Sequence, residues 1–303
     1  MHSWVVWILA SAVFLALYDL AKKASVRNNA VISVLLCSTL FGCTAYLAGL
    51  AVSGHFKLAL EALGGRVWTL GLLKSLIVAS SWIFTFCALR TLPITIATPI
   101  RASSPALVFV AAFFLYGEVP TTVQALGMIL VFIGYWTFSW AGRHEGIDFL
   151  RNRAVWCAVV GACLSACSSI WDKYVFQVVG LAVEPTQFVF QLGLVAVYAV
   201  CLVVQRAFTK SAVRHHLPPP PQSFSWRWTI PLVGILLAMA DWLYFKGLAI
   251  PDAPISVGSL MRRFSVAITF VLGALFFHET NLRRKSVALA LVLTGIALLV
   301  VRN

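Results

Sequence analysis

The chain has 303 residues, of which 61% are hydrophobic and 11% are charged. Soluble domains contain roughly 45–50% apolar and about 25% charged residues, so the composition excludes an ordinary soluble protein and indicates an integral membrane protein. The net charge of +13 would suggest a nucleic-acid partner in a soluble chain. Membrane proteins, however, concentrate Lys and Arg in their cytoplasmic loops, and we therefore expect no nucleic acid.

Ten apolar runs separated by polar breaks predict ten transmembrane helices. Their lengths of about 17–24 residues suit a hydrocarbon core of roughly 30 Å at about 1.5 Å per residue. The first run has no basic leader before it, so we interpret it as a helix rather than as a cleavable signal. In chain order the runs cover residues 4–22, 30–52, 67–89, 94–116, 121–141, 155–177, 185–206, 228–249, 254–277 and 285–301.

The two halves of the chain resemble each other. Tyr18-Asp19 in the first predicted helix corresponds to Trp171-Asp172 in the sixth. Four further positions recur at a constant spacing of 161 residues: Pro93, Arg101, Ser104 and Glu118 correspond to Pro254, Arg262, Ser265 and Glu279. Because each half has an odd number of helices, the second copy enters the membrane in the opposite orientation.

We therefore predict an all-α membrane protein whose ten transmembrane helices form two inverted five-helix repeats, residues 1–142 and 143–303. The longest polar break, residues 207–227, contains four consecutive prolines and is expected to be an exposed, extended loop of the second repeat. Inverted repeats are typical of secondary transporters, which bind their substrate near the bilayer midplane between the repeats.

Basic residues predict the orientation. The loops that follow odd-numbered helices contain fourteen Lys and Arg, whereas the opposite side of the membrane has three. The positive-inside rule therefore places the first set in the cytoplasm and both termini outside.

The most unusual stretch is a polar interruption of the ninth run, residues 256–264, which includes Arg262 and Arg263. One arginine at the centre of a membrane helix costs about 2.5–3.5 kcal/mol and stays charged, so it requires a partner, a wet cavity or an anionic ligand. Arg101 and Arg262 enter from opposite faces to similar depths, and we expect them to straddle the midplane about 8 Å apart along its normal. A phosphate or carboxylate between them would accept bidentate hydrogen bonds. Alternatively, the arginines form structural ion pairs with buried aspartates.

Other charged and aromatic residues within the runs extend the candidate site. Lys74 either contacts the substrate or extends its amine to the membrane surface. Asp241 either pairs with an arginine or carries a proton, and Lys246 lies close enough along the helix to pair with it instead. Asp19 is expected to pair with the lysines that follow it, and Asp172 with a residue of another helix, although their repetition also suggests a gate. Aromatic residues in this set serve either packing or ligand contact.

In total, the candidate substrate-binding residues are Arg101, Arg262, Arg263, Lys74, Lys246, Tyr244 and Trp82, and the candidate coupling or ion-pair residues are Asp241, Asp19 and Asp172. No Gly-rich phosphate loop, zinc-binding helix or nucleophile elbow is present in the sequence. The seven cysteines lie in apolar runs without the spacing of a metal site or a disulfide framework. We therefore expect no enzyme, no metal and no cofactor.

Two pairs of segments carry a family resemblance. Residues 88–118 and 247–279, each ending in an aromatic-rich stretch before a glutamate, resemble the signature of the EamA-type drug/metabolite transporter superfamily, although Val266 stands where the first copy has Pro105. The resemblance spans essentially the whole chain and implies a ten-helix transporter. Members of that superfamily commonly have both termini inside, contrary to the charge distribution.

A narrower similarity concerns the arginines. Residues 99–105 and 259–264 are similar to the segments with which plastid triose-phosphate/phosphate translocators bind phosphate, with Arg101 in place of a lysine and Arg262-Arg263 in place of a Lys-Arg pair. The similarity implies an anion site and leaves the substrate unnamed.

We thus expect a secondary transporter that moves a small anionic, phosphate-bearing organic metabolite by alternating access, with exchange of one anion for another. It would act as a monomer or homodimer, with membrane lipids around it, in a plasma membrane, and the short tails favour a bacterial inner membrane. The alternatives are a proton-coupled amino-acid or drug exporter, in which Asp241 carries the proton, a lipid-phosphate flippase, and a membrane scaffold that transports nothing.

Overall fold

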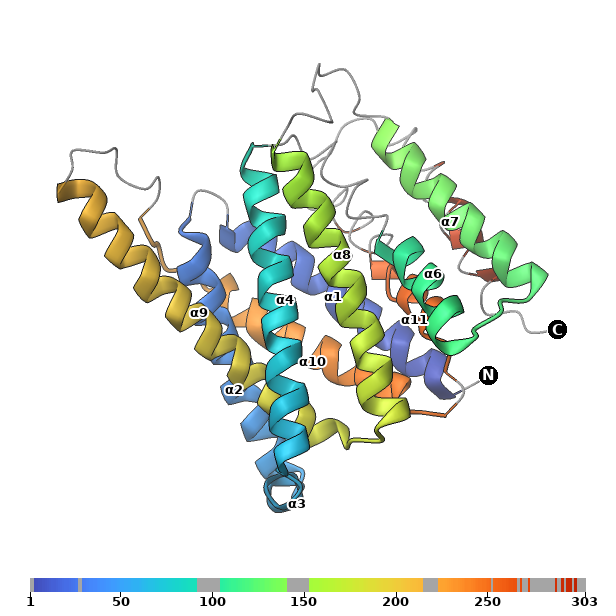
Figure 1. The fold of residues 1–303 in the computed structure, drawn as a ribbon, viewed down its shortest axis with the longest axis horizontal. Helices are drawn as coiled ribbons and strands as arrows, with labels where there is room; N and C mark the ends of the chain where they lie inside the picture. Colours follow the sequence, from blue (N-terminus) through green and yellow to red (C-terminus); the bar gives the residue numbers. More distant parts are fainter. Residues whose placement is uncertain are drawn as a thin grey trace. The chain divides into compact units, whose positions relative to one another are not determined.

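The computed structural model describes residues 3–26, 29–91, 104–140, 153–214, 223–251 and 253–265, together with isolated positions between 268 and 298. Every regular element in these residues is a helix (Figure 1). The elements are α1 (Ser3–Val26), α2 (Val31–Val52), α3 (Phe56–Glu61), α4 (Gly65–Thr91), α6 (Ser104–Tyr116), α7 (Thr122–Trp140), α8 (Arg153–Lys173), the π-helical turn η1 (Tyr174–Val178), α9 (Val183–Arg214), α10 (Thr229–Leu248) and α11 (Ile255–Met261).

Six of these helices are long and apolar enough to cross a membrane. The spans are Trp4–Val26, Val31–Val52, Gly65–Thr85, Arg153–Val178, Val183–Ala207 and Thr229–Leu248, and two shorter apolar helices cover Leu107–Tyr116 and Thr122–Gly134. The helices α6 and α7 expose large apolar side chains such as Phe114 and Trp136, as expected of surfaces that face lipid. An all-helical membrane protein with several spans is therefore confirmed for the described residues, whereas the ten-helix, two-repeat arrangement stays a prediction.

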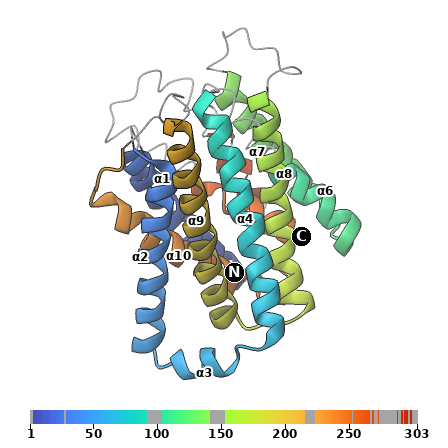
Figure 2. The same ribbon diagram turned by 60° about the vertical axis from the view of Figure 1, so that its left-hand side comes forward.

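Three local features differ from the sequence-based expectation. The helix α9 continues through Arg214, eight residues beyond the run predicted to end at 206, so it includes the beginning of the 207–227 break. The short helix α3 was not expected, because six residues are too few for a periodic pattern. It lies between the ends of α2 and α4 that are lowest in Figure 2. The third feature, a break in the ninth run, concerns the candidate site.

The chain forms two compact units. One consists of Met1–Val13, Ser80–Gly180 and Leu243–Asn303, and the other of Phe14–Ala79 and Leu181–Trp242. We call them unit 1 and unit 2. Each unit takes residues from both halves of the sequence, and α1, α4 and α10 contribute to both.

Small residues allow close helix packing inside each unit. In unit 2, a Cβ atom added to Gly42 of α2 would lie 2.7 Å from the carbonyl oxygen of Gly234 of α10. Also in unit 2, the Ser75 hydroxyl of α4 donates to the carbonyl oxygen of Phe190 of α9 at 2.9 Å. In unit 1, the Ser81 hydroxyl donates to the Gly161 carbonyl oxygen of α8 at 2.8 Å. Because lipid tails are as apolar as Leu, such close contacts and interhelical hydrogen bonds are what hold membrane helices together.

Candidate functional site

The helix α11 ends at the predicted arginine pair. The Arg262 amide still donates to the Gly258 carbonyl oxygen, four residues back, at 3.0 Å. The Arg263 amide instead donates to Leu260, three residues back, at 2.9 Å, and Ser265 donates to Arg262 at 3.3 Å. The expectation of an unbroken helix from 254 to 277 is therefore wrong, because the α-helical hydrogen bonding changes to a tighter turn at the two arginines. Interrupted helices occur at membrane depth where the backbone is buried in protein or lines a cavity.

The Arg262 side chain lies on an aromatic ring. Its guanidinium carbon is 4.4 Å from the ring centroid of Tyr244, which belongs to the last two turns of α10 and is 1% exposed. The ring of Tyr244 in turn contacts Phe245, with the centroids 5.9 Å apart, and Phe245 contacts Phe176 at 5.0 Å. A cation over the face of an aromatic ring is attracted by the electrons of that face. The structure therefore brings together two of the predicted substrate-binding residues, one from each side of the α10–α11 turn.

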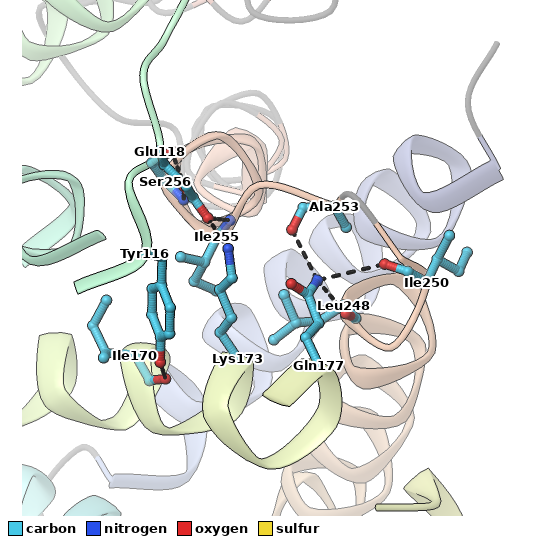
Figure 3. A network of polar contacts seen from close by, with 10 residues as sticks. All are labelled: Tyr116, Glu118, Ile170, Lys173, Gln177, Leu248, Ile250, Ala253, Ile255 and Ser256. Carbon is cyan, nitrogen blue, oxygen red and sulfur yellow. Dashed lines mark hydrogen bonds and ion pairs between the residues drawn. The ribbon is translucent and has the colours of Figure 1, made fainter. Parts of the chain in front are cut away.

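A glutamate distant in the sequence caps the N-terminus of α11. Pro254 occupies the N-cap position and has no side-chain acceptor for the first amides of the helix. Glu118 provides the acceptors: Oε1 accepts from the Ile255 amide at 2.9 Å, and Oε2 accepts from the amide and hydroxyl of Ser256 at 3.1 and 2.6 Å. Lys173 of α8 forms an ion pair with the same carboxylate (Figure 3). Four donors thus converge on one carboxylate that is 10% exposed.

The local sequence holds Glu118 in position. Gly117 has a φ of +63°, which favours glycine, and it ends α6 immediately before the glutamate. On the other side, Thr121 and Gln124 exchange side-chain to backbone hydrogen bonds at 3.1 and 3.3 Å and start α7 as a capping box. The three residues between Gly117 and Thr121 form a short, defined loop.

The ion pair keeps Glu118 charged. Burial by itself raises the pKa of this carboxyl, but the hydrogen bonds from Lys173, from Ser256 and from the Ile255 amide outweigh the burial, so that the pKa lies below its ordinary value. The ammonium group of Lys173 is also 4.6 Å from the ring centroid of Tyr116. Sequence analysis identified Glu118 only as a repeat position, since neither partner lies near it in the sequence.

In unit 2, a buried lysine contacts an aromatic ring. Lys74 of α4 is 3% exposed, and its amine is 4.8 Å from the ring centroid of Phe190 of α9. Because Lys74 is buried, its side chain is directed into the protein rather than extended to the membrane surface. One turn before Phe190, Gln187 is completely buried and donates to the Ala238 carbonyl oxygen at 2.7 Å, while its Oε1 accepts no hydrogen bond in the part of the chain that the structure describes. Sequence analysis missed Gln187, because an uncharged residue within an apolar run gives no signal of its own.

Comparisons with known proteins found one family for the first part of the chain. A model of the EamA-like transporter family matches residues 2–140. The resemblance to the EamA-type superfamily is thereby confirmed for these residues. Together with the six long apolar helices, the match supports a multi-pass membrane protein.

A solved structure extends the likeness beyond the matched half. A protein of known crystal structure has 19% sequence identity to this chain and a TM-score of 0.72, and the match covers 98% of this chain and 96% of that one. The two proteins therefore share one fold along nearly their full lengths. A comparison with curated proteins found no match.

The other predicted site residues are distributed over both units. Trp82, Asp172, Lys246 and Arg263 belong to unit 1, as do Arg262 and Tyr244, whereas Asp19, Lys74 and Asp241 belong to unit 2. Asp172 and Asp241 are buried, at 4% and 8% exposure, whereas the others besides Lys74 and Tyr244 are half-buried. Arg101 lies outside the described residues. A single site that combines residues of both units stays a prediction.

Proposed function

We propose that this EamA-like protein is a secondary transporter that binds a small anionic, phosphate-bearing organic metabolite and moves it by alternating access. The observation that carries the proposal is the contact of Arg262 with the buried ring of Tyr244 at the end of α11. Transport itself follows from the family, and the anionic substrate is inferred from the arginine.

The geometry suits an oxyanion. A guanidinium group is planar, and its N–H groups point outward in that plane. A ring that contacts one face of such a group restricts the directions in which its N–H groups point. A phosphate or carboxylate accepts two parallel hydrogen bonds from one edge of the group, which gives direction as well as charge. The ring thus orients the donor, and an anion with two oxygens on one atom fits it.

The sequence around Arg262 supports an anion site. The helix α11 contains Ser256, Gly258 and Ser259 within two turns of Arg262, and it is closely packed, since a Cβ atom at Gly258 would lie 3.0 Å from the Ile8 side chain. In the two-repeat arrangement, Arg101 is the counterpart of Arg262 and supplies a second cation. The similarity of both segments to phosphate-binding segments of triose-phosphate/phosphate translocators supports a phosphate ester as the ligand.

The same charge favours exchange over one-way transport. Closing a transporter around cationic groups with no anion in place buries charge at a free-energy cost, whereas closing around a bound anion does not. The protein would therefore change its orientation faster when loaded on either side. Counterflow, in which one anion inside vesicles drives uptake of another, should be much faster than uptake into empty vesicles.

The test uses the full chain purified in detergent and reconstituted into vesicles. A thermal-shift screen with phosphate esters, carboxylates and amino acids identifies the ligand class, since a ligand at 100 times its Kd adds about 2.7 kcal/mol to stability. Arg262→Ala should abolish the shift and the counterflow, whereas Arg66→Ala, which removes an exposed arginine from the beginning of α4, should leave both unchanged. Full phosphate-ester counterflow by Arg262→Ala, or a response to amino acids alone, would overturn the proposal.

A further inference from the structure

The end of α8 and the π-helical turn η1 that follows it contact both ends of the α10–α11 turn. Gln177, in η1, donates through its side-chain amide to the carbonyl oxygens of Leu248 and Ala253 at 2.8 and 2.9 Å. Lys173, one turn earlier, is bound to Glu118, which caps the beginning of α11. Residues four apart share a helix face, and Figure 3 shows Lys173 extending toward Glu118 and Gln177 toward the turn. The C-terminal end of α10 and the N-terminal end of α11 are therefore attached to one element.

The contacts at the start of α11 can affect the position of Arg262, because α11 is short and buried. All seven residues of α11 are buried, and seven residues span only about 10 Å along a helix axis. The last turn is joined to Arg262 by the hydrogen bond from its amide to Gly258. A packed helix of this length moves as one body, so a displacement at Ile255 is carried to Arg262.

The position of Tyr244, the aromatic partner of Arg262, depends on the contact between Gln177 and the end of α10. Tyr244 lies one turn before Leu248, whose carbonyl oxygen Gln177 holds. The two members of the stacked pair are thus at the two ends of the segment that α8 fixes. Their alignment requires that α10 and α11 keep their relative position across the turn.

We propose that Glu118 and Lys173 form a latch that sets the position of α11 and thereby aligns Arg262 on Tyr244 for anion binding. Both are positioning residues, since they act through Arg262. The inference rests on the proposed function for the role of Arg262, and the alignment itself can be tested without a ligand. Glu118→Gln removes the charge and one of the two acceptor oxygens at the first α11 amides, and Lys173→Met leaves a buried carboxylate without its cation. Either change loosens the start of the helix.

The first experiment measures hydrogen exchange by mass spectrometry on the full chain with no ligand added. Glu118→Gln and Lys173→Met should each speed exchange of the amides from Ile255 to Arg263 at least about tenfold, because local opening sets these rates. Lys173→Arg keeps the charge and should exchange as the unaltered protein does. The matched controls are Glu61→Gln and Lys57→Met, which change the same residue types in α3. Unchanged exchange of α11 in both latch variants would overturn the proposal.

The second experiment measures counterflow with a phosphate ester. Glu118→Gln should raise KM about tenfold while kcat changes less than about twofold, as expected when substrate and transition state lose the same binding energy. The separate variant Lys173→Arg keeps the cation and should retain the KM of the unaltered protein. A general folding defect would instead lower kcat as well as affinity.

The two inferences fail in different ways. If no phosphate ester binds the unaltered protein, or if Arg262→Ala binds it normally, the proposed function is wrong and the exchange experiment still decides the latch. If Arg262→Ala loses binding while Glu118→Gln retains the original KM and exchange rates, the latch alone is wrong.

Discussion

Replacing Tyr244 tests how far its ring prepares Arg262 for an anion. Tyr244→Leu removes the aromatic face and keeps an apolar side chain, whereas Tyr244→Phe keeps the face and removes only the hydroxyl. The ring is 1% exposed and its centroid is 4.4 Å from the guanidinium carbon, whereas Arg262 itself is half-buried. A contact of this kind contributes up to about 2 kcal/mol.

The expected loss of affinity follows from this magnitude. An energy of about 2 kcal/mol corresponds to about a 30-fold change in Kd. The stack needs no anion to form, however, so part of its energy is common to the free and bound protein and cancels. We therefore expect Tyr244→Leu to weaken anion binding by about 5- to 30-fold, and Tyr244→Phe by less than about threefold. Leu is smaller than Tyr, and Tyr244→Leu should also lower the free energy of unfolding by about 1–3 kcal/mol.

The assay is titration of the purified variants with the phosphate ester that gives the largest thermal shift. Thermal stability without ligand is recorded first, so that affinity is compared only at a temperature where each variant is folded. Equal Kd values for the Leu and Phe variants would refute the reasoning: if both match the unaltered protein, the ring does not orient the arginine, and if both are weak, the hydroxyl rather than the aromatic face is responsible.

Three further predictions concern packing, pH and the second cation. Gly42→Ala should destabilise the protein by about 1–3 kcal/mol, because its Cβ would lie 2.7 Å from the Gly234 carbonyl oxygen, whereas Gly49→Ala, with open space around its Cβ, should not; equal melting temperatures would contradict this. The pKa of Glu118 lies below its ordinary value of 4.5, so its stabilisation is complete above pH 5 and declines as the pH falls through the lowered pKa. Melting curves of the unaltered protein and Glu118→Gln should therefore differ by a constant amount from pH 5 to 7 and converge in more acidic buffer, and convergence on raising the pH would show the opposite linkage. Lys74→Met should weaken phosphate-ester binding while it preserves or raises thermal stability, because it replaces a buried cation by an apolar side chain, and unchanged affinity would remove Lys74 from the site.

Several features of this protein follow from its sequence alone. Hydrophobic run length predicts membrane helices because the bilayer requires each segment to satisfy its own backbone hydrogen bonds, whatever the neighbouring segments do. Sequence reasoning therefore located α2, α4 and α10 to within a few residues and identified the transporter family from small-residue patterns. It also selected Arg262 and Tyr244 individually, since a charge or a polar aromatic residue within an apolar run is costly and therefore notable.

The contacts around the α10–α11 turn could not be predicted from the sequence. Lys173 and Glu118 are 55 residues apart, and the pairing of Arg262 with Tyr244 depends on how α10 and α11 are held together. The break at Arg262 was hidden for a similar reason: the residues from 254 to 277 have helical composition throughout, and only the hydrogen bonds of the folded chain change there.

One physical cause separates the features that the sequence predicts from those that only the tertiary structure decides. Membrane burial is decided residue by residue through transfer from water to lipid, so composition and spacing determined that this chain is helical, spans the membrane several times and carries cations at unusual depth. Once helices are in lipid, transfer no longer distinguishes one arrangement from another, and specific packing and hydrogen bonds choose among them. Only the tertiary structure, accordingly, decided that Glu118 caps α11 and that Arg262 lies on Tyr244.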